Sequence, residues 1–104
     1  THIHRVLGQA PSIAAACFRI YIGQDIIDPD INLSYAENFL QMSLGDDNQI
    51  AKNPKIAQAL ETLFILHAEH ELSCSTAAMR HMTSVLADVY SSLSGAITAV
   101  YGPR

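Results

Sequence analysis

Apolar residues recur at intervals of three and four along most of this chain, and a sustained alternation at intervals of two is absent from the sequence. The first 21 positions show the pattern most clearly, in the apolar residues Ile3, Leu7, Ala10, Ala14, Cys17 and Tyr21. This spacing places side chains on one face of an α-helix. Because a proline lacks the backbone donor and crowds the preceding turn, Pro11 predicts either a kinked helix or two helices that meet near Ala10.

A loop and a short helix are expected next. Pro29 biases the residue before it away from the helical region, so residues 24–33 predict a loop. Ser34 and Glu37 form an S-x-x-E capping box, which starts a helix. Gly45 is expected to end that helix.

Two further helices follow from their start signals. Asn53 with Pro54 begins a helix that is expected to run to about His70, because proline is well tolerated at the first helical position. Either Ser73 or Ser75 can cap the next helix. The apolar positions of this helix are expected to face inward: Ala78, Met79, Met82, Val85 and Leu86.

The segment 89–101 carries no charged residue. Asp88, just before this segment, is expected to end the preceding helix or to cap the next one. A helix without a charged face is buried on several sides, and small residues allow another helix to approach closely: Ser92, Gly95, Ala96 and Ala99. We therefore expect this helix in a helix sandwich or at a subunit interface. In total the sequence predicts an all-α fold of five or six helices.

Composition excludes several classes of protein. Hydrophobic residues make up 49% of the 104 residues and charged residues 15%, which is typical of a globular domain or a piece of one. A net charge of −4 with six Lys and Arg disfavours nucleic-acid binding. No uncharged stretch reaches the ~20 residues that span a bilayer, and no signal peptide is evident. We expect an intracellular protein without membrane association, with Cys17 and Cys74 as free thiols.

Histidines and carboxylates crowd into residues 63–81, which raises the question of a metal site. His67 and Glu71 lie four positions apart and His67 and His70 three apart, so one helical face could present them together. The pattern H-x-x-H-E nevertheless matches neither HExxH nor HxxEH. We therefore expect no metal site.

Position along the chain predicts different roles for these residues. His67 follows the apolar stripe and is expected at the edge of a core. His70 lies where one helix ends and the next begins, a place where ligands bind. Glu71 is expected to partner a ring nitrogen or a helix N-terminus. Ser75 is expected to be a small residue at a helix start, and His81 to be exposed.

Two runs, LHAEHELSCSTAAMRH and, a few residues later, DVYSSLSGAITAVYGP, resemble the citrate synthase family, whose pattern reads LHAxHExNxST, a spaced D-x-Y, an alanine- and glycine-rich helix, and GP. Upstream, LGQAPSIAAACFR and LSYAENFLQM resemble segments of the same family in the same order. The resemblance implies that residues 1–104 are one segment of the mainly helical large domain of such an enzyme.

The resemblance also implies an activity and partners. The family is homodimeric and condenses acetyl-CoA with oxaloacetate, then hydrolyses the citryl thioester; acetyl-CoA is a co-substrate, and no prosthetic group is needed. His70 corresponds to the histidine that binds oxaloacetate. Ser75 corresponds to a serine that helps to hold the first catalytic histidine. Residues 1–21 and 89–101 correspond to helices at the dimer interface.

Departures from the family pattern leave alternatives open. Ser73 stands where the family usually has asparagine, and the sequence stops at Arg104, before the family's HGG with the first catalytic histidine. We therefore expect this chain alone to be inactive. A truncated, non-catalytic paralogue that acts as a helical interaction module is one alternative. A segment of 2-methylcitrate synthase, which uses propionyl-CoA, is another.

Overall fold

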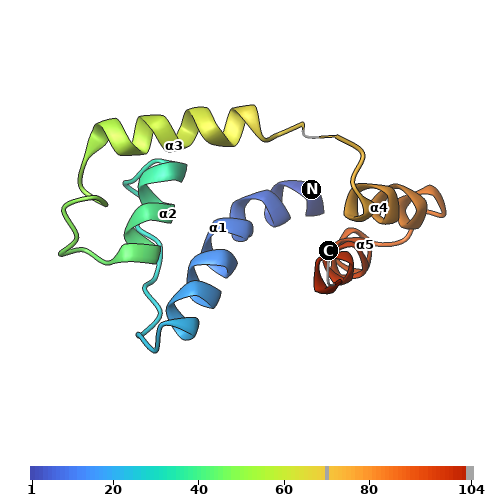
Figure 1. Ribbon diagram of the computed structural model, residues 1–104, viewed down its shortest axis with the longest axis horizontal. Helices are drawn as coiled ribbons and strands as arrows, with labels where there is room; N and C mark the ends of the chain where they lie inside the picture. The colour runs from blue at the N-terminus through green and yellow to red at the C-terminus, as the bar shows by residue number, and fades with distance from the viewer. Residues whose placement is uncertain (70, 103–104) are drawn as a thin grey trace. The chain divides into compact units, whose positions relative to one another are not determined.

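The computed structural model describes residues 1–69 and 71–102, which form helices joined by loops (Figure 1). In chain order the helices are α1 (His2–Tyr21), α2 (Tyr35–Leu44), α3 (Pro54–Leu66), α4 (Cys74–Ser84), α5 (Val89–Ile97) and a 3₁₀ helix, η1 (Thr98–Tyr101). No strand occurs in the residues described, so the predicted all-α class is confirmed. The chain divides into two compact units, residues 4–68 and residues 1–3 with 69–104.

Helix α1 continues through Pro11 as one helix, so of the two predicted alternatives the one with two helices that meet near Ala10 is not found (Figure 1). Pro11 cannot donate to the Leu7 carbonyl oxygen, its helical partner. The Tyr35 hydroxyl of α2 donates to that oxygen instead, at 3.0 Å. A side chain from another helix thus satisfies the acceptor that the proline leaves open, which makes a helix with an internal proline tolerable.

The buried face of α1 is not the face that carries the predicted apolar stripe. The buried residues of α1 are Pro11, Ala15 and Arg19, four positions apart. All six residues of the predicted stripe are exposed: Ile3, Leu7, Ala10, Ala14, Cys17 and Tyr21. Arg19 is buried because its Nε donates to the carbonyl oxygen of Asp25, which anchors the following loop to the helix.

The predicted loop and caps of the first unit are confirmed. The Ser34 N–H donates to Glu37 Oε2 at 2.9 Å and the Glu37 N–H donates back to Ser34 Oγ at 3.4 Å, which completes the capping box of α2. Gly45 ends α2 at φ 91°, a left-handed conformation that favours glycine. Asn53 caps α3 by accepting the Lys55 N–H at 3.0 Å, with Pro54 first in the helix.

The buried apolar residues of the first unit come from three helices. They are Ala15 of α1, Ala36, Leu40 and Met42 of α2, and Ala57 of α3. The Phe64 ring meets the rings of Tyr35 and Phe39 edge-on, with centroids 5.8 and 5.9 Å apart, an arrangement that aromatic quadrupoles favour. Helix α3 ends at Leu66, earlier than predicted, because the chain tightens there and the Ala68 N–H donates three residues back, to the Ile65 carbonyl.

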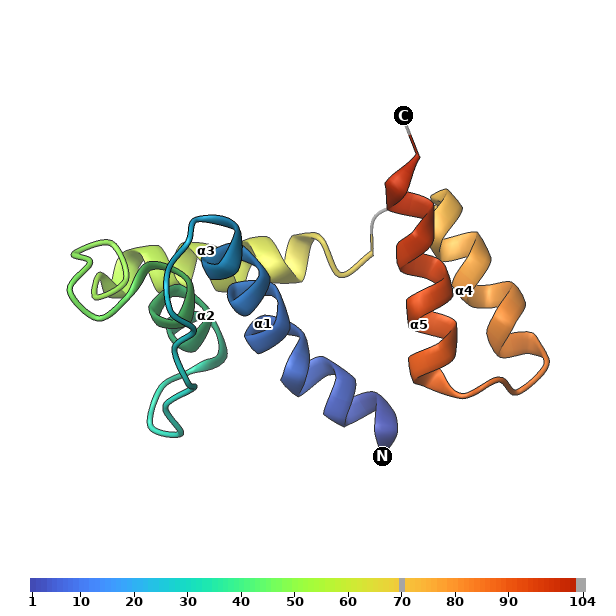
Figure 2. The same ribbon diagram turned by 90° about the horizontal axis from the view of Figure 1, so that it is seen from below.

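Helices α4 and α5 of the second unit lie side by side (Figure 2). Ser73 rather than Ser75 caps α4. Asp88 caps α5 by accepting the Tyr90 N–H at 2.9 Å. Hydrogen bonds from the Ser91 hydroxyl and the Tyr90 N–H hold the pKa of Asp88 below its usual 3.8.

The close approach of α5 to α4 confirms the prediction made from the small residues of segment 89–101. The expected burial on several sides is not found within the chain, because Tyr90, Ile97, Val100 and Tyr101 are exposed. Ser92 and Ala96 of α5 are buried, and a Cβ placed on Gly95 would lie 2.3 Å from Met82 Cε of α4. The α-helix ends at Ile97 and continues as η1, so the predicted helix 89–101 changes type in its last turn.

The prediction that Val85 and Leu86 face inward is wrong. They are 77% and 93% exposed, because α4 ends at Ser84 and the chain turns there. Leu86 makes that turn with φ 59°, which is left-handed and unusual for a leucine.

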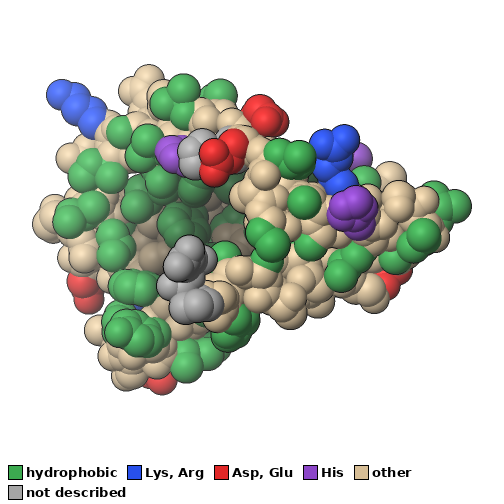
Figure 3. Space-filling model, turned by 45° about the vertical axis from the view of Figure 1, so that its right-hand side comes forward, with side chains coloured by type: hydrophobic (Ala, Val, Ile, Leu, Met, Phe, Trp, Pro, Cys, Tyr) green, Lys and Arg blue, Asp and Glu red, His purple; other side chains and the backbone are tan. Residues whose placement is uncertain are grey.

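Large hydrophobic side chains also remain exposed on both units. Figure 3 shows hydrophobic side chains at many places on the surface. Among the helices that the structure describes, none combines the length and the hydropathy needed to cross a membrane.

Candidate functional site

Three hydroxyl groups meet at the start of α4. Ser73 Oγ lies 3.0 Å from Ser75 Oγ and 3.1 Å from Thr76 Oγ1, and it accepts the Thr76 N–H at 3.4 Å. Ser73 and Ser75 are half-buried, whereas Thr76 is exposed. The structure therefore joins the predicted site residue Ser75 directly to the helix cap.

Sequence reasoning missed Thr76. The signal was the S-x-S-T run, because a residue three positions after an N-cap presents its N–H to the capping side chain. A threonine at that position also brings its hydroxyl to the same oxygen.

His70, the predicted oxaloacetate-binding residue, lies outside the residues that the structure describes, so its role stays a prediction. Its neighbour Glu71 is exposed and has φ 52°, a left-handed conformation that costs free energy for a residue with a Cβ. The predicted role of Glu71 as the partner of a ring nitrogen or a helix N-terminus stays a prediction.

His67 is exposed at the end of α3 rather than at the edge of a core, so that part of the prediction is wrong. The helix ends one residue earlier, and the ring Nδ1 lies 2.9 Å from the Leu63 carbonyl oxygen. The imidazole thus contacts the last turn of its own helix. His81 is exposed on α4, as predicted.

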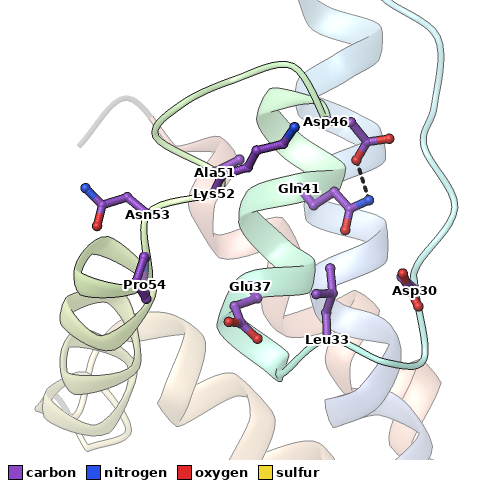
Figure 4. Close-up of a pocket in the computed structure, with 9 residues that line it drawn as sticks. All are labelled: Asp30, Leu33, Glu37, Gln41, Asp46, Ala51, Lys52, Asn53 and Pro54. Atoms are coloured by element: carbon purple, nitrogen blue, oxygen red, sulfur yellow. Dashed lines mark hydrogen bonds between the residues drawn. The ribbon is translucent and has the colours of Figure 1, made fainter.

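A pocket in the first unit lies beside α2 and the loop that leads to α3 (Figure 4). Its carboxylates belong to Asp30, Glu37 and Asp46, and each is already engaged: Asp30 with Asn32, Glu37 with Ser34, and Asp46 with Gln41. Hydrogen bonds from the Ser34 backbone and hydroxyl hold the pKa of Glu37 below its usual 4.5. These carboxylates serve turns and caps, and the pocket contains none of the predicted site residues.

Within residues 1–69 and 71–102, no three His, Cys, Asp or Glu side chains are grouped so that they could hold a metal ion. Cys17 and Cys74 are both free and exposed. Cys17 belongs to the first unit and Cys74 to the second.

Comparison with known proteins relates the whole chain to one family. Residues 1–104 match the family described as citrate synthase, C-terminal domain. The chain is 53% identical over 103 residues to citrate synthase 1, peroxisomal, of Arabidopsis thaliana, and 52% identical over 103 residues to the glyoxysomal citrate synthase of Cucurbita maxima. Each alignment covers 97% of this chain, and 21% and 20% of the two relatives, respectively.

A solved structure shares the fold. The citrate synthase of Pyrobaculum aerophilum superposes with a TM-score of 0.77 at 36% identity, over 89% of this chain and 22% of that chain. The chain therefore spans about one fifth of the length of the curated relatives that it matches.

Proposed function

Since this chain belongs to the citrate synthase family, we propose that the protein condenses acetyl-CoA with oxaloacetate and releases citrate and free CoA. The observation that carries the proposal is the 53% identity over 97% of the chain, a span that includes the histidine motif of residues 66–76. The reaction uses acetyl-CoA as a co-substrate and needs no prosthetic group.

Residues 1–104 supply part of the groups that this reaction needs. His70 binds oxaloacetate, because an imidazole N–H can donate to a carbonyl or carboxylate oxygen. Ser75 supports the first catalytic histidine from the start of α4. Proton abstraction beside a thioester also needs a base and a stabilised enolate oxygen. By the family pattern those groups are not among residues 1–104, so turnover is assayed on the full-length enzyme that contains this segment.

The protein forms a homodimer through residues 1–21 and 89–101. Both segments carry large side chains that are exposed, including Leu7 and Phe18 of the first and Val100 and Tyr101 of the second. Exposed apolar surface of this kind is typical of an interface. An intracellular location is also proposed, in keeping with the words peroxisomal and glyoxysomal in the names of the two relatives.

The two alternatives are not favoured, because both relatives are named citrate synthase. A thiol-release assay distinguishes the three hypotheses: citrate synthase, 2-methylcitrate synthase and a non-catalytic module. The purified full-length enzyme that contains this segment is given oxaloacetate with acetyl-CoA or with propionyl-CoA. We expect faster release from acetyl-CoA, whereas preference for propionyl-CoA supports 2-methylcitrate synthase and no release with either supports a non-catalytic module.

The role of His70 is tested by His70→Ala, which removes a hydrogen bond to a charged substrate. Such bonds contribute about 1.5–3 kcal/mol, so the KM for oxaloacetate should rise by about 10- to 100-fold. His81→Ala, at an exposed histidine of α4, is the matched control and should leave kinetics unchanged. Equal KM values for the two variants would exclude His70 from the oxaloacetate site.

A further inference from the structure

The hydroxyl of Ser73 is fully occupied at the start of α4. A serine hydroxyl has one proton to donate and two lone pairs that accept. Ser73 Oγ accepts the Thr76 N–H and also meets the hydroxyls of Ser75 and Thr76, at 3.0 and 3.1 Å. One of these two bonds must therefore use the Ser73 proton, and the other must be accepted by Ser73.

Two arrangements of the protons satisfy this count. In the first, Thr76 donates to Ser73 and Ser73 donates to Ser75, which leaves the Ser75 proton available to a group outside the cluster. In the second, Ser75 donates to Ser73 and Ser73 donates to Thr76, so Ser75 can only accept from outside. The Ser73 hydroxyl thus determines whether Ser75 acts as a donor or as an acceptor.

We propose that Ser73 is a positioning residue for the reaction, which orients the Ser75 hydroxyl and keeps its proton available to the catalytic histidine. This inference rests on the proposed function, in which Ser75 supports that histidine. The half-burial of Ser73 and Ser75 strengthens it, because water competes less well for a hydroxyl that is partly covered.

The hydrogen bonds of Ser73 also explain how a serine can replace the asparagine that the family usually has at this position. An asparagine offers an acceptor to the helix N–H and a separate donor to a neighbour. A serine performs both tasks with one oxygen, provided that a second hydroxyl completes the set. Thr76 supplies that hydroxyl here.

Substitutions of Ser73 separate capping from proton placement. Ser73→Asp keeps a good N-cap but offers only acceptors, so the Ser75 proton is drawn toward the carboxylate. Ser73→Thr keeps both the cap and the donor. We expect Ser73→Asp to lower kcat about tenfold with KM for both substrates within about twofold, and Ser73→Thr to retain activity. Thermal unfolding should show both variants folded.

The control and the double variant make the test specific. Ser84→Ala removes a hydroxyl that donates to the His81 carbonyl at 2.7 Å, at the exposed end of the same helix, and should leave kcat unchanged. In a Ser75→Ala background, Ser73→Asp should change kcat by less than about twofold, because the group that it misdirects is gone.

The outcomes that contradict the two proposals differ. An active wild-type protein with an unchanged kcat in Ser73→Asp would overturn this inference alone. So would a tenfold loss that persists in the Ser75→Ala background. A full-length wild-type enzyme that forms no citrate would overturn the proposed function and this inference with it.

Discussion

The Tyr35 hydroxyl of α2 donates a hydrogen bond to the Leu7 carbonyl of α1 at 3.0 Å, on the one oxygen that Pro11 deprives of its helical partner. A proline inside a helix usually costs ~3 kcal/mol, partly through the lost backbone bond. The contact therefore joins α2 to α1 at the turn where Pro11 removes a backbone hydrogen bond.

The coupling between Tyr35 and Pro11 can be measured. Tyr35→Phe removes only the hydroxyl and should cost about 1 kcal/mol of unfolding free energy. In a Pro11→Ala background the alanine N–H can donate to Leu7, so Tyr35→Phe should cost clearly less. Urea unfolding of the four proteins in this double-mutant cycle gives the coupling. An equal cost in both backgrounds would show that the hydroxyl does not compensate for the proline.

Acid should weaken the caps of α2 and α5. Hydrogen bonds lower the pKa of Glu37 below 4.5 and that of Asp88 below 3.8 in the folded state. A lowered folded pKa gives stability that is present above the unfolded value and is lost as the pH falls through the folded value. We therefore expect unfolding free energy to fall as the pH drops below about 4.5. Ser34→Ala should raise the Glu37 pKa in an NMR titration and leave that of Asp88 unchanged.

Gly95 and Met82 should show strong coupling at the contact of α4 with α5. Alanine is about 1 kcal/mol better than glycine in a helix interior, but a Cβ on Gly95 would lie 2.3 Å from Met82 Cε and 2.5 Å from its Sδ. Gly95→Ala should therefore bring little or no gain in the wild type, and about 1 kcal/mol in a Met82→Ala background. The same change in both backgrounds would contradict this contact.

Leu86 offers a stabilising substitution. It is 93% exposed and has φ 59°, so glycine would relieve backbone strain without loss of packing. Leu86→Gly should raise the unfolding free energy by about 0.5–1 kcal/mol. Val85→Gly is the matched control, because Val85 is 77% exposed with an ordinary φ of −97°, and it should be destabilising. Two losses of equal size would argue against a left-handed Leu86.

Helix starts could be predicted from the sequence because their causes are local. The side chains of three residues each accept a backbone N–H from two or three residues later in the sequence: Ser34, Asn53 and Asp88. A spacing this short can be recognised from the sequence alone. The end of α3 was predicted too late, because no glycine or proline marks Leu66. The choice between Ser73 and Ser75 as a cap needed the geometry itself.

Buried faces were harder to predict, for a different reason. In α1 apolar residues lie on more than one face, so periodicity cannot select the row of Pro11, Ala15 and Arg19 over the exposed stripe that begins at Ile3. Arg19 is buried through its bond to the Asp25 carbonyl, which hydropathy does not reveal. The hydroxyl cluster of Ser73 likewise depends on side-chain positions that a family pattern with asparagine does not suggest.

The most direct test of the proposed function follows the product. The purified full-length enzyme that contains residues 1–104 is incubated with oxaloacetate and isotope-labelled acetyl-CoA, and citrate is identified by NMR while free thiol is measured. The proposal predicts one labelled citrate for each CoA released, with the Ser75→Ala variant slower than the wild type. Thiol release without labelled citrate, or neither product, would contradict it.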